Sequence, residues 1–109
     1  MAFQHAQMAA GRWRTMSLFE QLGNIGSEIS RARRSRATHP DRFENAVIRA
    51  LELFDLTLQD PRWRGRRKEI ARSREILCDI VWGESRYATS LDDLQRYFDT
   101  YALAARQTR

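Results

Sequence analysis

Residues 60–83, DPRWRGRRKEIARSREILCDIVWG, combine a strongly basic first half with an apolar second half. Asp60 followed by Pro61 is typical of a helix start, and Gly83 is typical of a helix end. Apolar residues recur between these limits at helical spacing, so one side of the segment can be buried. We therefore predict a single helix from residue 61 to residue 82. Its core seam consists of Trp63, Ile70, Leu77 and Ile80.

Three further segments show the same periodicity, which predicts helices over 17–34, over 40–59 and from residue 90 to near the C-terminus. Ser17, Thr38 and Ser90 are each placed to cap one of these helices. The first stripe consists of Leu18, Leu22, Ile25, Ile29 and Ala32. The second consists of Phe43, Val47, Ala50, Leu51, Phe54 and Leu58, widened by Ile48, Leu53 and Leu56. The last consists of Leu91, Leu94, Phe98, Tyr101 and Ala105.

Short connections between four helices force neighbours to run in opposite directions, because a few residues cannot cross the length of a helix. A chain of 109 residues is also too short for two independent cores. We therefore predict an all-α, antiparallel up-down four-helix bundle that forms a single domain over residues 16–109. Gly23 and Gly26 interrupt the first helix, where they mark either a bend or a close approach of another backbone.

Residues 1–15 differ from the rest, since they contain no acidic residue and no sustained periodicity. We interpret them as a flexible N-terminal arm or an over-extended start, with an organelle-targeting segment as the weaker alternative. The chain has a single cysteine and no apolar stretch of bilayer length. These features, together with the lack of a secretory signal, favour a cytoplasmic protein and no membrane partner.

The formal net charge is +5, and every basic residue except Lys68 is an arginine. Residues 1–37 and 61–82 carry net positive charge, whereas residues 38–60 carry net negative charge. Two clusters stand out, and a helix of about 20 residues, about 30 Å long, would hold them at opposite poles of the bundle. The first cluster is Arg31, Arg33, Arg34 and Arg36. The second is Arg62, Arg64, Arg66, Arg67 and Lys68.

The second cluster is the better candidate for binding nucleic acid or another anion, because cations at a helix start oppose the helix dipole. Pairing with Asp55 and Asp60 of the preceding helix is the alternative explanation, and surface charge runs are usually solvated or internally paired. Trp63 fits the core seam, so we interpret it as a buried anchor rather than a base-stacking platform.

No metal-ligand spacing, phosphate-binding loop or catalytic motif occurs in the sequence, so no metal or cofactor is predicted. Residues 34–39, RSRATH, resemble the Arg-x4-His motif of HEPN ribonucleases, which are small helical bundles. The resemblance implies that Arg34 binds the scissile phosphate and that His39 assists proton transfer. The motif falls in the connection between two predicted helices, and Pro40 follows His39 directly, whereas the family places it in a helix.

Two longer stretches resemble small prokaryotic helical-bundle proteins of unassigned function. They are RALELFDLTLQDPRWRGRRKEI at residues 49–70 and SLDDLQRYFDTYALAAR at residues 90–106. The resemblance implies a helical fold and a prokaryotic, cytosolic source, and it implies no activity.

These patterns favour a non-catalytic protein-interaction or assembly module that forms a homo-oligomer or binds a protein partner. The wide apolar side of residues 40–59 and the aromatic residues near the C-terminus exceed what one thin bundle can bury. An RNA- or DNA-binding accessory subunit, using the basic start of the third helix, is the alternative, and a HEPN-like ribonuclease is the remote one. No small-molecule substrate is indicated. The interface candidates are Ile48, Leu53, Leu56, Tyr97 and Tyr101.

Overall fold

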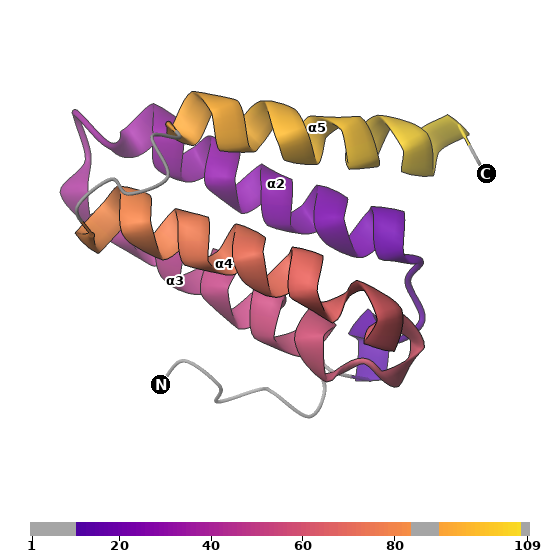
Figure 1. Cartoon of the computed structure of the whole chain (residues 1–109). Coiled ribbons are helices and arrows are strands. Elements are labelled where there is room, and N and C mark those ends of the chain that lie inside the picture. The colour runs from indigo at the N-terminus through magenta and orange to yellow at the C-terminus, as the bar shows by residue number, and fades with distance from the viewer. Residues whose placement is uncertain (1–10, 84–89, 108–109) are drawn as a thin grey trace.

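The computed structural model describes residues 11–83 and 90–107, and every regular element within these ranges is a helix. The prediction of an all-α chain is therefore confirmed for this part. No helix in it is both long and apolar enough to cross a membrane. A single helical turn over residues 11–13 comes first. It is followed by α2 (Leu18–Ser35), α3 (Pro40–Gln59), the 3-10 helix η1 (Pro61–Arg66), α4 (Arg67–Trp82) and α5 (Leu91–Gln107) (Figure 1).

The predicted cap of α2 is confirmed, because Ser17 and Glu20 bond each other's backbone N–H groups in a capping box. The predicted cap of α3 is wrong. The carbonyl of Ser35 accepts from the backbone N–H groups of both Thr38 and His39, so the turn continues for one residue beyond the expected cap. His39 takes the cap position without a side-chain bond to the helix, and the Thr38 hydroxyl instead lies 2.8 Å from His39 Nδ1.

The single helix predicted over 61–82 is also wrong, because the chain forms the tight helix η1 before α4 begins. Trp63 has φ −103° and ψ 24°, outside the α-helical range. Asp60 holds this turn by accepting the backbone N–H of Arg62, as expected for a cap. Trp63 turns inward, and Gly65, a poor helix former, follows two residues later. The tight turn therefore brings the Trp63 ring back towards α2.

Helix α2 is the centre of the fold and packs mainly against α3 and α5 (Figure 1). Its predicted stripe is confirmed as core, since every member is less than 9% exposed. Gly26 explains the close fit of α5, because a Cβ atom at this position would lie 2.8 Å from the Cβ of Phe98. The main core cluster also contains Ala50, Phe54, Ile70, Leu77, Leu91, Leu94 and Phe98.

Contacts along neighbouring helices run in opposite chain order. Arg33 contacts Asp92 near the start of α5, and Gly26 faces Phe98 further along that helix. We name the two ends of the molecule by the elements that lie there. The turn pole is where residues 35–40 join α2 to α3, and α4 ends there, since Arg36 Nη2 donates to the Ile80 carbonyl at 3.4 Å. The η1 pole contains η1, the start of α2 and the end of α3.

Residues 1–10 of the expected N-terminal arm lie outside the described residues, whereas residues 11–15 belong to the packed structure. Trp13 is 5% exposed, and its indole Nε1 donates to Thr57 Oγ1 at 2.9 Å. The Trp13 carbonyl accepts from Gln21 Nε2 at 2.8 Å. An isolated tryptophan has no periodicity to place it, so nothing in the sequence pattern separates residues 11–15 from the arm.

Candidate functional site

The second basic cluster lies at the η1 pole, where Arg62 binds a buried carboxylate. Asp60 is 1% exposed, and Arg62 donates to it from Nε at 3.0 Å and from Nη2 at 2.7 Å. These hydrogen bonds lower the pKa of Asp60 from 3.8 to about 2, against the opposing effect of burial. The Arg62 guanidinium also lies 4.4 Å from the centre of the Trp63 ring. Arg62 therefore stabilises the fold through a buried ion pair, and its side chain is 40% exposed.

Gln21, fully buried in α2, connects this ion pair to two tryptophans of the η1 pole, the buried Trp13 and the half-buried Trp63. Its Oε1 accepts from Trp63 Nε1 at 2.9 Å, and its Nε2 donates to Asp60 Oδ2 at 3.3 Å as well as to Trp13. Each of these buried polar groups has a partner, which a stable core requires. Trp63, predicted as a buried anchor, is only half-buried, but it packs against the main core cluster and donates to Gln21.

Two more members of the second cluster are also engaged within the chain. Arg66 Nε lies 3.2 Å from Glu69 Oε2, and Arg67 Nε donates to the Leu58 carbonyl at 3.2 Å. Asp55 does not pair with this cluster as expected, because it binds Arg74 of α4 at 2.9 Å. Arg64 and Lys68 of this cluster are exposed and form no hydrogen bond or ion pair with another described residue.

The predicted interface residues are largely used within the chain, so most of the apolar side of α3 faces the chain's own core. Leu56 is 8% exposed, and Leu53 packs against the main core cluster. The hydroxyls of Tyr97 and Tyr101 both bond Glu69 Oε1, at 2.7 Å and 3.0 Å, and fasten α5 to α4. These hydrogen bonds, Tyr97 first, lower the pKa of Glu69. Ile48 and Tyr97 remain 37% and 38% exposed.

A hollow of about 530 Å³ opens between α2 and α3, and most of the charged residues that line it are arginines. We call it the α2–α3 hollow. Glu28, which is 5% exposed, forms the floor of the hollow. Its Oε2 atom accepts from Arg31 at 2.9 Å and from Arg49 at 3.3 Å. The remaining polar lining includes Arg34, Ser35, Thr38, His39, Arg42 and Asn45. Four arginines and one carboxylate therefore line the hollow, and two of the arginines bind the carboxylate.

Two of these arginines have no acidic partner among the described residues. Arg34 donates only to the Ser30 hydroxyl at 3.1 Å, and Arg42 has no hydrogen bond or ion pair. His39 uses Nδ1 for its contact with Thr38, which leaves Nε2 without a partner in the described part of the chain. The start of α3, with its partial positive charge, lies at the same place. The hollow is thus a concave surface with excess positive charge.

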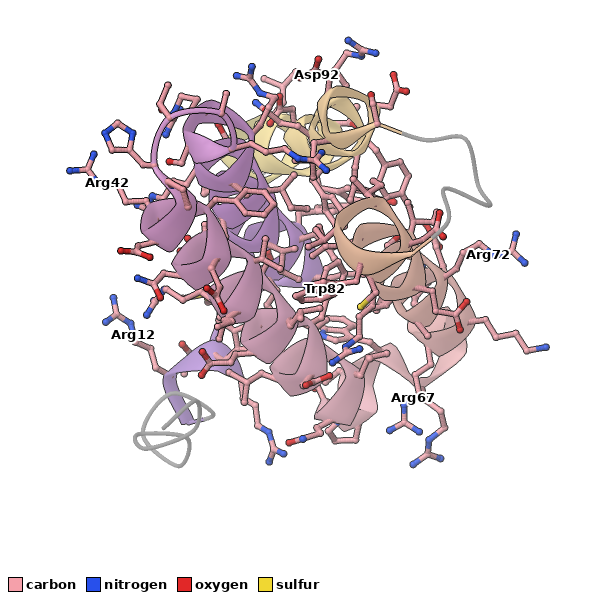
Figure 2. The ribbon with its side chains drawn as sticks, turned by 90° about the vertical axis from the view of Figure 1, so that its left-hand side faces the viewer. Arg12, Arg42, Arg67, Arg72, Trp82 and Asp92 are labelled. Carbon is pink, nitrogen blue, oxygen red and sulfur yellow. The ribbon has the colours of Figure 1, made fainter. Side chains whose placement is uncertain are left out.

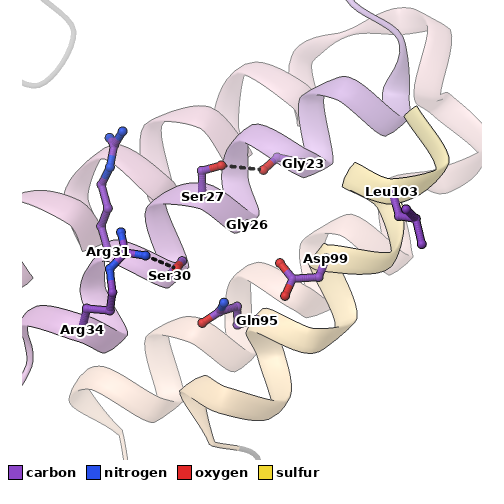
Figure 3. Close-up of a pocket in the computed structure, with 9 residues that line it drawn as sticks. All are labelled: Gly23, Gly26, Ser27, Ser30, Arg31, Arg34, Gln95, Asp99 and Leu103. Carbon is purple, nitrogen blue, oxygen red and sulfur yellow. Dashed lines mark hydrogen bonds between the residues drawn. The ribbon is translucent and has the colours of Figure 1, made fainter. Parts of the chain in front are cut away.

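Arg31 and Arg34 also line a second hollow of about 560 Å³ between α2 and α5 (Figure 3). Its walls are small residues of α2, including Gly23 and Ser27, and polar residues of α5, including Asp99. The two arginines therefore form a ridge between the two hollows, where their side chains can reach a ligand lying across α2.

The first basic cluster is thus divided by the fold. Arg31 and Arg34 face the α2–α3 hollow, whereas Arg33 contacts Asp92 and Gln95 of α5. Arg36 donates to the end of α4, and its guanidinium lies 5.5 Å from the centre of the Phe43 ring. Arg42 and Arg49, which complete the hollow, were missed in the sequence. Their spacing of seven residues on the polar side of one helix was the available signal.

Within residues 11–83 and 90–107, no group of three or more His, Cys, Asp or Glu residues could hold a metal ion. A scan against protein-family models, a search of curated proteins and a search of solved structures each returned no match to this chain. The function is therefore inferred from the chemistry of the hollow.

Proposed function

We propose that this chain is an antiparallel four-helix bundle that binds the phosphate backbone of RNA or DNA, without catalysis, through the α2–α3 hollow. The observation that carries this proposal is the set of four arginines around the single buried carboxylate of Glu28. Opposite running order along α2–α3 and α2–α5 supports the bundle architecture.

Arginine is the residue best suited to phosphate, because its planar guanidinium forms two parallel hydrogen bonds to one anion. The side chains of Arg31 and Arg49 are 60% and 65% exposed, so they can exchange Glu28 for an incoming phosphate without unfolding. Arg42 and Arg49 are seven residues apart on α3, which is about 10 Å along the helix. A single site can thus contact successive phosphates of one strand.

Two other hypotheses from the sequence have less support. At the η1 pole the ion-paired side chains of Arg62 and Arg66 are 40% and 45% exposed, which is less than the exposure of the ion-paired Arg31 and Arg49 of the hollow. Self-association through α3 loses Leu53 and Leu56, which pack within the chain. Light scattering on the purified protein tests the second hypothesis, since a stable dimer at micromolar concentration would support it.

The proposal is tested by measuring the binding of fluorescent RNA and DNA to two variants with the same change in net charge. Arg42→Glu alters the α2–α3 hollow, and Arg64→Glu alters the η1 pole. Each phosphate contact contributes about 0.9 to the slope of log K against log salt concentration. We expect a slope of about −3 for the wild type, reduced by about one in Arg42→Glu. The Arg64→Glu variant should keep the wild-type slope.

An equal loss of affinity in both variants would show that only net charge matters and would overturn the proposed site. A greater loss of affinity in Arg64→Glu would place the binding site at the η1 pole instead. Affinity that does not change with salt would reject phosphate-backbone binding altogether.

A HEPN-like ribonuclease is the second candidate, because Arg34 and His39 line the same hollow. In that mechanism Arg34 would bind the phosphate and His39 Nε2 would transfer the proton. Incubation of the same RNA with wild type and His39→Ala tests this candidate. Cleavage that is equal in both proteins would reject it, and no cleavage by either would leave binding as the function.

A further inference from the structure

Trp82 is the last residue of α4. Its exposed fraction, 62%, is the highest among the large apolar side chains of the described residues. The other two tryptophans are used inside the fold, where Trp13 and Trp63 both donate their indole N–H groups to partners from other segments. Large aromatic side chains are seldom left in water without a use. Trp82 therefore stands out as a surface residue that the core does not explain.

The surroundings of Trp82 are basic and belong to the turn pole. Arg36 donates to the carbonyl of Ile80, two residues before Trp82, and its guanidinium covers the Phe43 ring. Phe43 adjoins Arg42 of the α2–α3 hollow. Val81 packs against a small core cluster that includes Ala46, a residue that lines the same hollow. Figure 2 looks onto this pole and shows Trp82 near its centre, at the end of α4, and Arg42 pointing outward at the left of the view.

We infer that Trp82 is a binding residue that stacks on an unpaired base of the nucleic acid held in the α2–α3 hollow. This inference rests on the proposed function and names its substrate class, a single strand or an unpaired end. Arg36 contacts both the Ile80 carbonyl near the end of α4 and the Phe43 ring near the start of α3, so it offers a cation to a strand that crosses the turn pole towards the indole ring.

Stacking requires an aromatic face, and in the described part of the chain no Phe, Tyr or Trp lines the hollow, whose one aromatic ring is the small imidazole of His39. The hollow alone would therefore bind duplex and single strands through their phosphates. Bases inside a duplex are already stacked on each other and cannot reach an exposed indole ring. Trp82 would thus give the chain a preference for unpaired nucleotides, and this preference would depend little on sequence, because every base has a π face.

The test compares the affinity of the full-length wild type and Trp82 variants for a single-stranded RNA and for its blunt-ended duplex. We expect Trp82→Ala to bind the single strand about fivefold or more weakly, with a change in duplex affinity below about twofold. Trp82→Phe keeps an aromatic face and should recover most of the loss. Ile48→Ala is the matched control, because Ile48 is an apolar side chain that is 37% exposed and lines neither hollow.

A second readout is acrylamide quenching of tryptophan fluorescence. The single strand should reduce quenching in the wild type, and this protection should disappear in Trp82→Phe, where only the two internal tryptophans remain. Equal losses for strand and duplex, or no loss for the strand, would overturn the inference while Arg42→Glu still tests the hollow. A change of oligomeric state in Trp82→Ala without RNA would assign this surface to an interface between copies instead.

Discussion

At the η1 pole, Arg62 donates to the Asp60 carboxylate, which is 1% exposed, whereas in the α2–α3 hollow Arg42 forms no ion pair with any described residue. Arg62 belongs to a segment of net positive charge and Arg42 to one of net negative charge. What separates them is the local structure, because the η1 turn places Arg62 beside a buried acceptor and α3 directs Arg42 into an open hollow. Positive charge in a sequence therefore indicates a ligand only where the fold leaves that charge without an internal partner.

The strongest test of this comparison measures the stability lost with a buried tryptophan, Trp13, against the stability lost with an exposed one, Trp82. Trp13→Ala removes a buried ring and leaves Thr57 without its donor, so we expect a loss of about 3–5 kcal/mol in the free energy of unfolding. Trp82→Ala should change it by no more than about 0.5 kcal/mol. Urea unfolding followed by circular dichroism measures both values. Similar losses would mean that the two poles do not differ in this way.

The same comparison can be made with arginines. Arg62→Ala leaves the Asp60 carboxylate with only the Arg62 backbone N–H and Gln21, so we expect a loss of about 2–3 kcal/mol. Arg42→Ala removes a side chain without partners and should leave the free energy of unfolding within about 0.5 kcal/mol of the wild type. Binding should show the reverse order at temperatures where both variants are folded. A stability loss in Arg42→Ala would contradict its assignment to a ligand.

Acid titration sharpens the comparison at Asp60. Its pKa is about 2 in the folded chain against an ordinary value of 3.8, so the ionised form stabilises the fold. That stabilisation is complete above pH 3.8 and is lost as the pH falls through about 2. The difference corresponds to about 2 kcal/mol. Asp60→Asn should lack this part of the pH dependence, and equal acid sensitivity in both proteins would show that Asp60 does not contribute it.

Much of the fold could be predicted from the sequence, because helical periodicity reports directly which side of a helix is buried. The limits of α3 were predicted to the residue, and the members of the α2 stripe are all in the core. The break between η1 and α4 was missed, since it depends on Gln21 of another helix receiving the Trp63 indole. Long-range hydrogen bonds of this kind have no periodicity.

The candidate site was predicted only in part, for a related reason. Arg31 and Arg34 were in the first cluster, but their partners across the hollow, Arg42 and Arg49, come from a helix whose net charge is negative. Averaging charge over a segment conceals which side of the helix the cations occupy. The packing of α3 on α2, and not the composition of either helix, brings the four arginines together.

Glu28 allows the most delicate test, because it is the hollow's counterpart of Asp60. Both carboxylates are buried, but Glu28 binds arginines that are 60% and 65% exposed, whereas Arg62 is 40% exposed. Water can therefore replace the partners of Glu28 more easily, and Glu28→Gln should cost about 1 kcal/mol or less in the free energy of unfolding.

The effect of Glu28→Gln on binding should have the opposite sign. Glutamine keeps the size of the side chain and one acceptor oxygen, so Arg31 and Arg49 stay near their places while the only negative charge of the lining is removed. A unit charge about 5 Å from a bound phosphate is worth close to 1 kcal/mol in water, so affinity for RNA at low salt should rise about threefold. Weaker binding would instead mean that Glu28 holds the two arginines in the geometry that phosphate requires. The hollow would then resemble the η1 pole, where an acid is needed to position the cation.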